Sequence, residues 1–358
     1  MKNNCPLVSI IIISFNEVDL IGECLNHILA QSYDNYEVIV YDNASSDGTP
    51  DSIARNFPNI KLIRGAENIG FGGGNNEAAQ VASGKYLAFV NDDAYVAPGW
   101  LSPLVETLEA DPSIGCAGPE LMCLEKRDTV LCHGNGIHLS GVAYLNDRGQ
   151  LARPASPMEV GGISGAAFLI HRDLFLELGG FESMFFLYYE DTDLSLRLHL
   201  MGKRYVIVPG AMVYHNSESR FGLQKLYHLE RNRYLSLFSL MSAGMLVLMA
   251  PSMFLFELIS WGYCLLQGRG ALQAKARAWR DIYRLRSWIK ARRNRYERKV
   301  TSAYLDWVFT PKIHIEYVHS FRLLSQIVRV VGYLIAVPSF LLARLYLTFK
   351  SKFQASMT

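Results

Sequence analysis

The chain has 358 residues, of which 50% are hydrophobic and 19% are charged, and its net charge is +2. This composition excludes a disordered or collagen-like chain, because the apolar content is high and neither glycine (28) nor proline (13) dominates. The charge is uneven, since residues 269–300 hold 12 Lys and Arg against 2 Asp and Glu, so the rest of the chain is net acidic. A basic block on an otherwise acidic protein indicates an anionic partner surface, and membrane lipid is the first candidate.

The six cysteines include no CxxC pair, and we therefore expect reduced, intracellular thiols. A zinc site on Cys132, His133 and His138 is disfavoured, because no second ligand pair has the usual spacing. The first apolar run, residues 7–14, is too short for a secretion signal with a cleavage site and is predicted to be a buried strand.

The first hundred residues alternate between strand and helix patterns. Strands are predicted over 7–14, 36–41, 60–64 and 86–90, and helices over 18–31, 50–56 and 75–83, the last preceded by a Gly-rich segment. This alternation predicts an α/β fold with a mostly parallel sheet covered by helices on both faces. Ligands of such folds bind beyond the carboxyl ends of the strands, where this chain has polar clusters at 15–17, 42–47 and 91–93.

The next segment has a mixed pattern. Helices are predicted over 101–110, 173–178 and from 190 to about 201, with strands over 166–171 and 205–208 and a short strand reaching 214–215. We predict one domain over 1–225, with a nucleotide-binding half (1–100) and an acceptor half (101–225).

The remainder, 226–358, is predicted to be helical and membrane-associated. Residues 235–256 carry no charge over 22 positions, which is long enough to cross ~30 Å of hydrocarbon. A second apolar run, 330–343, has 14 residues and is more typical of an in-plane or re-entrant helix than of a spanning one. The alternative for both runs is a helical hairpin buried against the globular part.

Two carboxylate clusters are candidates for chemistry. Asn91, Asp92 and Asp93 follow an apolar strand and could hold a hard divalent cation, although a turn or helix cap explains them equally simply. Glu190, Asp191 and Asp193 open a helix, where they either stabilise the helix N-terminus or provide a general base.

Other candidate positions each have two interpretations. Asp42 could accept hydrogen bonds from a nucleobase and ribose, or begin an Asx turn. His215 could be a metal ligand or a surface histidine. The Gly-rich stretch 68–75 could cradle phosphate. It is not a dinucleotide fingerprint, because Asn75 occupies the position where the fingerprint requires its last glycine.

The order of these motifs resembles that of the family-2 glycosyltransferases, in particular the rhamnosyltransferase-like branch of bacterial surface polysaccharide synthesis. The resemblance covers residues 6–233, and its motifs are VSIIIISFN (8–16), VIVYDNASSDG (38–48), NIGFG (68–72), FVNDD (89–93), FFLYYEDTDL (185–194) and VYH (213–215). It implies a GT-A fold, a nucleotide-diphosphate sugar donor, a divalent cation (Mg²⁺ or Mn²⁺) and inversion at the anomeric carbon.

The resemblance also implies roles for individual positions. Asp191 would be the catalytic base, and Asp93 and His215 would hold the metal. The expected nucleotide-sugar-binding residues are Ser14, Asn16, Glu17, Asp42, Asn68, Gly70, Asn76 and Asp92. Gly165, Tyr189 and Glu190 are candidates for the acceptor or sugar pocket. The usual Asp-x-Asp begins here with Asn91, and the Gln-x-x-Arg-Trp signature of processive synthases is absent, which favours addition of a single sugar.

The hypothesis from the sequence is an inverting, metal-dependent transferase at the cytoplasmic face of the inner membrane, with no nucleic-acid partner. It would move one sugar, rhamnose being the first candidate, from a dTDP- or UDP-sugar to a lipid-linked saccharide. A non-catalytic GT-A scaffold of an assembly complex is the main alternative. A nucleotide-sugar pyrophosphorylase is disfavoured, because residues 14–17 lack the Gly-rich basic loop that it needs after the first strand.

Overall fold

The computed structural model describes residues 5–151, 155–216, 222–296, 308–311 and 322–355. For 322–330 and 350–355 it describes the backbone alone. The chain forms two compact units. One comprises residues 1–134, 145–198 and 203–219, and the other 135–144, 199–202 and 220–358. The predicted boundary at 225 differs mainly in the segment 135–144, which belongs with the C-terminal helices because its strand pairs with a strand at 309–310.

The first unit is built on a mixed sheet with the strand order β10-β12-β6-β11-β4-β1-β2-β3. Its strands are β1 (Val8–Ser14), β2 (Tyr36–Asp42), β3 (Lys61–Arg64), β4 (Tyr86–Asn91), β5 (Ala94–Val96), β6 (Ile114–Cys123), β7 (Val130–Cys132), β10 (Met158–Glu159), β11 (Ala167–His171) and β12 (Arg204–His215). Strands β1 to β4 are parallel to one another, as the sequence predicts. Strand β11 runs antiparallel to both β4 and β6, so the sheet reverses direction at its centre.

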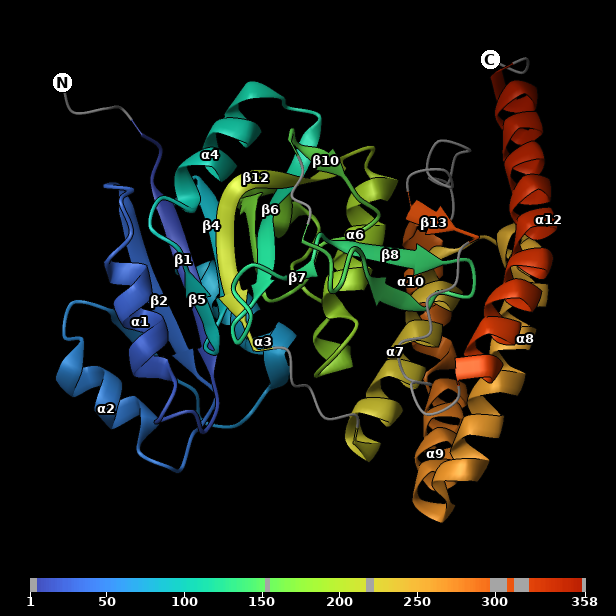
Figure 1. The fold of residues 1–358 in the computed structure, drawn as a ribbon, viewed down its shortest axis with the longest axis horizontal. Helices are drawn as coiled ribbons and strands as arrows, with labels where there is room; N and C mark the ends of the chain where they lie inside the picture. Colours follow the sequence, from blue (N-terminus) through green and yellow to red (C-terminus); the bar gives the residue numbers. More distant parts are fainter. Residues whose placement is uncertain (1–4, 152–154, 217–221, 297–307, 312–321, 356–358) are drawn as a thin grey trace. The chain divides into compact units, whose positions relative to one another are not determined.

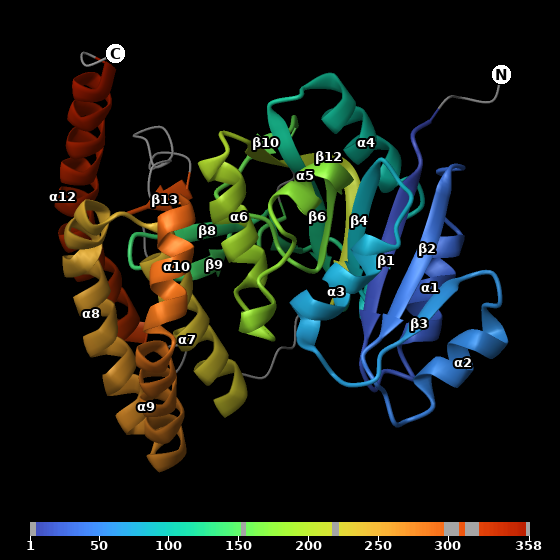
Figure 2. The same ribbon diagram turned by 180° about the vertical axis from the view of Figure 1, so that it is seen from behind.

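Helices cover both faces of this sheet. They are α1 (Ile21–Leu29), α2 (Thr49–Asn56), α3 (Gly70–Gln80), α4 (Leu101–Ala110), α5 (Arg172–Glu177) and α6 (Glu190–Leu200), with a short 3-10 turn η1 (Ser183–Phe185) before α6. Helices α1, α2 and α4 lie on the face turned toward the viewer in Figure 1, and α3, α5 and α6 on the face seen in Figure 2. Alternate side chains of β1 divide between the two layers, since Ile10 and Ile12 pack in the cluster that holds α1 and α4.

Two predicted elements differ from the structure. Helix α3 begins at Gly70, five residues before the predicted start, so most of the Gly-rich stretch 68–75 is helical. Two backbone N–H groups at the start of this helix have hydrogen-bond acceptors. The Asn68 side chain accepts the Gly70 N–H (2.9 Å), and the Phe186 carbonyl accepts the Phe71 N–H (2.8 Å). The two short strands predicted near 205–215 are one strand, β12, whose register shift between Val208 and Met212 accommodates Pro209.

The second unit is mainly helical, with α7 (Leu223–Leu240), α8 (Ala243–Gln267), α9 (Arg269–Arg284), α10 (Arg286–Tyr296) and α12 (Arg322–Ala355). A small sheet in the order β13 (Phe309–Thr310), β8 (Asn135–His138) and β9 (Ala143–Leu145) accompanies them. The uncharged run 235–256 is not one helix. The helix ends at Leu240 and restarts at Ala243, where the Ser242 hydroxyl caps the new helix by accepting the Met245 N–H.

The second predicted run, 330–343, lies inside the 34-residue helix α12. Within the described residues, α8 and the segment 331–349 are long and apolar enough to cross a membrane by length and composition.

Candidate active site

Three strand ends meet at one edge of the first unit's sheet. Ser14 at the end of β1 pairs with Asp42 at the end of β2, and Ile13 pairs with Asn91 at the end of β4. Asp92 and Asp93 come directly after Asn91. The polar clusters that follow the strands in the sequence are therefore neighbours in space, as parallel pairing requires.

Asp42 is the most buried acidic group at this edge, with 2% of its surface exposed. One carboxylate oxygen, Oδ2, accepts the N–H of Ser45, three residues on, at 3.1 Å, so the predicted local contact with Ser45 is present. The other, Oδ1, is buried and has no hydrogen-bond partner among the described residues. A buried carboxylate oxygen in this state is suited to accept a hydrogen bond from a ligand.

The loop after β1 is tied to the loop after β2. Asn16 has a positive φ of 58° and accepts the Ser46 N–H at 2.8 Å, while its own N–H donates to the Ser45 hydroxyl. The Glu17 N–H donates to the Thr49 hydroxyl (3.1 Å). The side chain of Asn16 thus shapes the rim of the site, and Glu17 lies on the same rim. Burial, together with the negative charge of Asp93, raises the pKa of Glu17.

Asp93 and His215 come together through strand pairing. His215 pairs with Ala94 across β12 and β5, which places its Nε2 atom 3.0 Å from Asp93 Oδ1. Burial would raise the pKa of Asp93, but the hydrogen bond and charge of His215 hold it below its usual value. Burial and the neighbouring charges of Asp93 and Glu17 raise the pKa of Asp92 to about 7.

A divalent cation fits this arrangement in part. The described residues contain no group of three or more His, Cys, Asp or Glu placed to hold a metal. Asp93 and His215, with Asp92 beside them, would supply only part of a coordination sphere. Such a donor set suits Mg²⁺ or Mn²⁺, which can take their remaining ligands from phosphate oxygens and water.

The alternative zinc ligands are engaged elsewhere. The Cys132 thiol contacts the Gly134 carbonyl oxygen at 2.8 Å, and the buried His133 ring lies between Glu120 (3.5 Å) and Asp147 (3.2 Å). All six cysteines are free thiols.

Asp191, at the start of α6, is held by three hydrogen bonds. Its Oδ2 accepts the Gly165 N–H at 3.0 Å, and its Oδ1 accepts the Thr192 N–H (2.6 Å) and hydroxyl (3.2 Å). Burial raises the pKa of Asp191, while these hydrogen bonds oppose the rise. Three donors aimed at one carboxyl group favour its ionised form.

Glu190, the preceding residue, has the opposite environment. It is 7% exposed, and its Oε2 atom is buried without a partner among the described residues. Burial and the charge of Asp191 raise the pKa of Glu190 to about 8. Burial thus raises both pKa values, but the hydrogen bonds to Asp191 oppose the rise there, so Asp191 is the more readily ionised member of the pair.

The Asp191 carboxylate lies at the same sheet edge as the Asp92–Asp93 cluster. The Asn91 N–H donates to the Ala166 carbonyl at 2.9 Å, where the start of β11 lies beside the end of β4. Gly165, which binds Asp191, immediately precedes Ala166. This continuous path of hydrogen bonds brings Asp191 and the metal-binding candidates to one edge.

The segment leading into α6 has a strained backbone. Phe186, Tyr188 and Tyr189 have φ values of 65°, 65° and 77°, which bulky residues rarely adopt. Tyr189 is buried. Gly70 lies so close to Phe186 that a Cβ atom on Gly70 would be 2.3 Å from the Phe186 carbonyl oxygen. The NIGFG motif thus supports this segment through its backbone.

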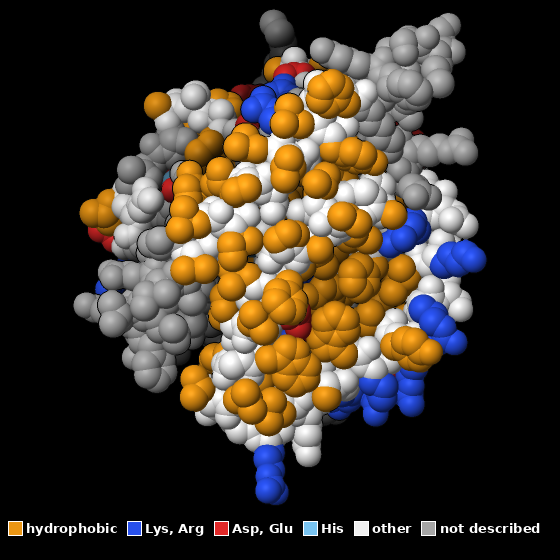
Figure 3. Space-filling view, turned by 90° about the vertical axis from the view of Figure 1, so that its right-hand side faces the viewer, with side chains coloured by type: hydrophobic (Ala, Val, Ile, Leu, Met, Phe, Trp, Pro, Cys, Tyr) orange, Lys and Arg blue, Asp and Glu red, His pale blue; other side chains and the backbone are white. Residues whose placement is uncertain are grey.

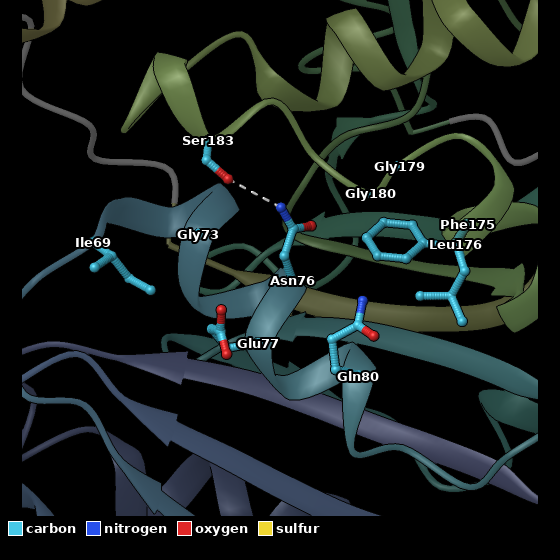
Figure 4. A pocket seen from close by; sticks show the side chains of 10 residues that line it. All are labelled: Ile69, Gly73, Asn76, Glu77, Gln80, Phe175, Leu176, Gly179, Gly180 and Ser183. Carbon is cyan, nitrogen blue, oxygen red and sulfur yellow. Dashed lines mark hydrogen bonds between the residues drawn. The ribbon is translucent and has the colours of Figure 1, made fainter.

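Asn76 and Asn68 have structural partners in addition to their predicted role. The Asn76 side chain accepts the Phe181 N–H (2.8 Å) and donates to the Phe181 carbonyl and the Ser183 hydroxyl, the last contact being visible in Figure 4. Asn76 also lines a cavity of about 360 Å³ together with side chains of α3, α5 and η1. Asn68 caps the Gly70 N–H, as described above. Asn76 therefore fixes the loop that precedes the strained segment, and Asn68 fixes the start of α3.

Sequence reasoning missed two supporting residues. The Asn43 side chain accepts the Ile69 N–H (2.9 Å) and donates to the Gly70 carbonyl (3.1 Å), so it joins the β2 loop to the NIGFG motif. Arg197 binds Asp193 at 2.7 Å and donates to the carbonyls of Leu178 and Gly180. The four-residue spacing of Asp193 and Arg197 was the available signal for this buried pair.

Known proteins resemble a large part of this chain in sequence. Residues 9–179 match the family "Glycosyl transferase family 2". An N-acetylglucosaminyl-diphospho-decaprenol L-rhamnosyltransferase of Mycobacterium tuberculosis is 27% identical over 219 residues, which are 54% of this chain and 70% of the relative. An O-antigen biosynthesis protein of Myxococcus xanthus is 29% identical over 60% of this chain but only 18% of its own length.

The fold also resembles that of a solved structure with low sequence identity. A solved structure of GalNAc-T7 with UDP, GalNAc and Mn²⁺ superimposes with a TM-score of 0.57 at 17% identity, covering 71% of this chain and 51% of the other. This likeness supports the fold, which is the GT-A fold with its central sheet between helices. Residues 9–179, slightly less than half of the chain, accordingly match glycosyl transferase family 2, and the chain is a glycosyltransferase.

Proposed function

We propose that the chain is an inverting glycosyltransferase that moves a single sugar from a dTDP- or UDP-sugar to a lipid-linked saccharide, rhamnose being the first candidate. The observation that carries this proposal is the hydrogen-bonded Asp191 carboxylate at the sheet edge that also holds Asp93 and His215. Inversion needs one base on the face of the sugar opposite the leaving nucleotide, and one such carboxylate suffices.

Asp191 is the base in this proposal. The acceptor hydroxyl must lose its proton as its oxygen attacks the anomeric carbon, and the ionised member of the Glu190–Asp191 pair can take it. The Gly165 and Thr192 donors fix the carboxylate in one orientation, so no reorganisation is needed at the moment of attack. The neutral Glu190 does not compete for the proton.

The leaving nucleoside diphosphate would bind along the ends of β4, β1 and β2. The unpartnered Oδ1 of Asp42 is suited to a nucleobase or ribose donor, with Ser14, Asn16 and Glu17 on the rim beside it. A divalent cation held by Asp93 and His215 would neutralise the charge that develops on the departing phosphate oxygens. Asp92, Asn68, Gly70 and Asn76 complete the proposed donor side, and Gly165, Tyr189 and Glu190 the acceptor side.

The acceptor is inferred from the relatives. The mycobacterial relative is named for transfer to a diphospho-decaprenol carrier, and the Myxococcus relative for O-antigen synthesis. A lipid-linked saccharide at the cytoplasmic face of the membrane is consistent with both names and with the two long apolar helices.

The test is the variant Asp191→Asn, measured by release of nucleoside diphosphate from a panel of UDP-, dTDP- and GDP-sugars with Mg²⁺ or Mn²⁺. We expect turnover to fall by a factor of about 10² or more, as removal of a general base does, while the donor still raises the melting temperature. Asp173→Asn is the control, because that side chain is 99% exposed on α5 and should leave turnover unchanged. Full turnover in Asp191→Asn would refute the base assignment.

The alternative is a GT-A protein that organises an assembly complex without catalysis. It has the same fold but requires no ionised carboxylate at the acceptor side. Absence of donor turnover in the wild-type protein with every sugar and both cations would favour the scaffold.

A further inference from the structure

Helix α8 exposes large apolar side chains and buries its polar ones together with three methionines. The exposed side chains Val247, Phe254, Leu258 and Leu265 recur at helical spacing along one stripe and are 71%, 67%, 57% and 65% exposed. The opposite stripe is buried or half-buried and contains Ser252, Glu257 and Ser260. A helix on the surface of a water-soluble protein instead exposes polar side chains and buries its large apolar ones.

The inner polar side of α8 is held by a cluster of four charges, which we call the ion cluster: Glu230 and Arg233 of α7, Glu257 of α8 and Lys275 of α9. Glu257 lies 2.9 Å from Arg233 and 3.0 Å from Lys275, and Lys275 also binds Glu230 at 2.7 Å. Two positive charges face two negative ones, so the cluster is neutral and its hydrogen-bonding groups are engaged. The orientation of α8 is therefore fixed by paired charges, and its apolar stripe must face outward.

Helix α12 has a similar arrangement and packs beside α8. Its buried side contains small residues, namely Gly332, Ala336, Ser339 and Ala343. Most of its large apolar residues point away, with Leu334 66% and Phe349 71% exposed, whereas Leu347 is buried. Small residues between helices and large ones outside are typical of helices packed in lipid. Figure 3, which views the side of α8 and α12, shows apolar side chains spread over this face, with Lys and Arg along one edge.

Helix α9 decides how deeply this face can enter a membrane. It packs along α8 on the side of the ion cluster and exposes Arg277, Arg280 and Arg284. If α8 crossed the bilayer, these guanidinium groups would lie at the depth of the hydrocarbon core, where charges are strongly disfavoured. If α8 lies in the plane of the membrane, the arginines reach the headgroup level and can contact anionic lipid.

We propose that the exposed stripes of α8 and α12 form a monotopic docking surface for an anionic phospholipid bilayer, lying within one leaflet without crossing it. The basic residues of α9 supply charge complementarity at the rim of this surface. The proposal concerns the second unit alone and does not depend on which sugar the first unit transfers.

Flotation of the full chain with vesicles tests the surface. We expect binding to vesicles of phosphatidylcholine with 30% phosphatidylglycerol, and at least tenfold weaker binding for the double variant Phe254→Glu/Leu258→Glu. The control Val81→Glu/Leu151→Glu adds the same charge at two exposed apolar positions of the first unit and should bind as wild type does. The variant Arg280→Glu/Arg284→Glu should lose the preference for anionic vesicles while still binding vesicles of phosphatidylcholine alone. Unchanged flotation of the Phe254/Leu258 variant would overturn the proposal.

A depth measurement distinguishes lying in the membrane from crossing it. Single cysteines at Val247, Phe254 and Leu265, labelled with an environment-sensitive dye after Cys5 and Cys123 are changed to serine, are quenched by lipids that carry the quencher at known depths. We expect all three positions to be quenched best by shallow quenchers. A deep central position 254 between two shallow ends would show that α8 spans. A detergent-free soluble dimer that the Phe254/Leu258 variant dissociates would show that a second copy of the chain covers the face, and this too would overturn the proposal.

Discussion

At the scale of single residues, two adjacent carboxyl groups behave differently because their hydrogen-bond partners differ. Asp191 accepts three donors, and Glu190 has a buried oxygen without one among the described residues. Two neighbouring carboxyl groups thus differ in how readily they ionise, because their surroundings differ.

The Glu190 environment predicts a pH dependence of stability. Its pKa rises from 4.5 to about 8 on folding, so the unfolded chain releases this proton at lower pH than the folded one. The contribution to stability is full below about pH 4.5 and is lost as the pH rises toward 8, by at most ~1.4 kcal/mol per pH unit. We expect Glu190→Gln to melt increasingly above wild type from pH 5 to pH 8, while exposed Glu177→Gln does not. Parallel melting curves of Glu190→Gln and wild type would contradict the prediction.

Gly165 offers a steric test of the acceptor side. A Cβ atom there would lie 3.5–3.8 Å from the Asp191 side chain, an ordinary contact that should leave the fold intact. We expect Gly165→Ala to keep its melting temperature within a few degrees but to lose turnover about tenfold or more, because the methyl group crowds the carboxylate. Gly22→Ala on α1, where nothing lies within 4 Å, is the control and should be fully active. Equal turnover of the two variants would exclude acceptor approach past Gly165.

At the scale of elements, the site depends on contacts between segments that are far apart in sequence. The start of α3 supports the strained backbone at 186–189. Asn43 joins the loop after β2 to the start of α3, and Asn76 joins α3 to the loop at Phe181. The strain at Phe186, Tyr188 and Tyr189 is retained because these contacts over-determine the conformation.

Gly70→Ala tests this support. The residue has φ +79°, and a Cβ atom would also meet the Phe186 carbonyl at 2.3 Å. Gly202→Ala is matched for backbone strain (φ +73°) but meets nothing within 4 Å. We expect Gly202→Ala to cost about 1 kcal/mol of unfolding free energy and to remain active. Gly70→Ala should cost more and lose turnover, as chemical unfolding and nucleotide-release assays would show. Equal losses in the two variants would indicate that the Phe186 contact has no functional role.

At the scale of the whole molecule, the chain has two units. In the helical unit, the ion cluster holds three helices together. The cluster joins α7, α8 and α9 through buried side chains, Lys275 being fully buried. Paired charges of this kind define an arrangement of helices, and removal of one partner leaves an uncompensated charge.

Lys275→Met should therefore lower the free energy of unfolding by about 3–5 kcal/mol, because Glu230 and Glu257 then share Arg233 alone. The double variant Lys275→Met/Glu230→Gln restores neutrality and should recover part of the loss. Denaturant unfolding of both variants in the same detergent measures this difference. A double variant less stable than the single one would show that packing rather than charge balance dominates.

The sequence by itself determined the fold class, the strand ends and the members of each motif. Those features depend on local periodicity and on the order of motifs, and the boundaries of α4 and β1 agree closely with their predictions. It did not determine the helical state of 70–75, because glycine-rich segments have weak intrinsic preference and this helix is stabilised by Phe186, more than a hundred residues away. It also did not determine the break at Met241–Ser242 or the outward face of α8. Those were decided by tertiary structure, since Glu257 finds its partners on two other helices and only that pairing fixes which side of α8 is exposed.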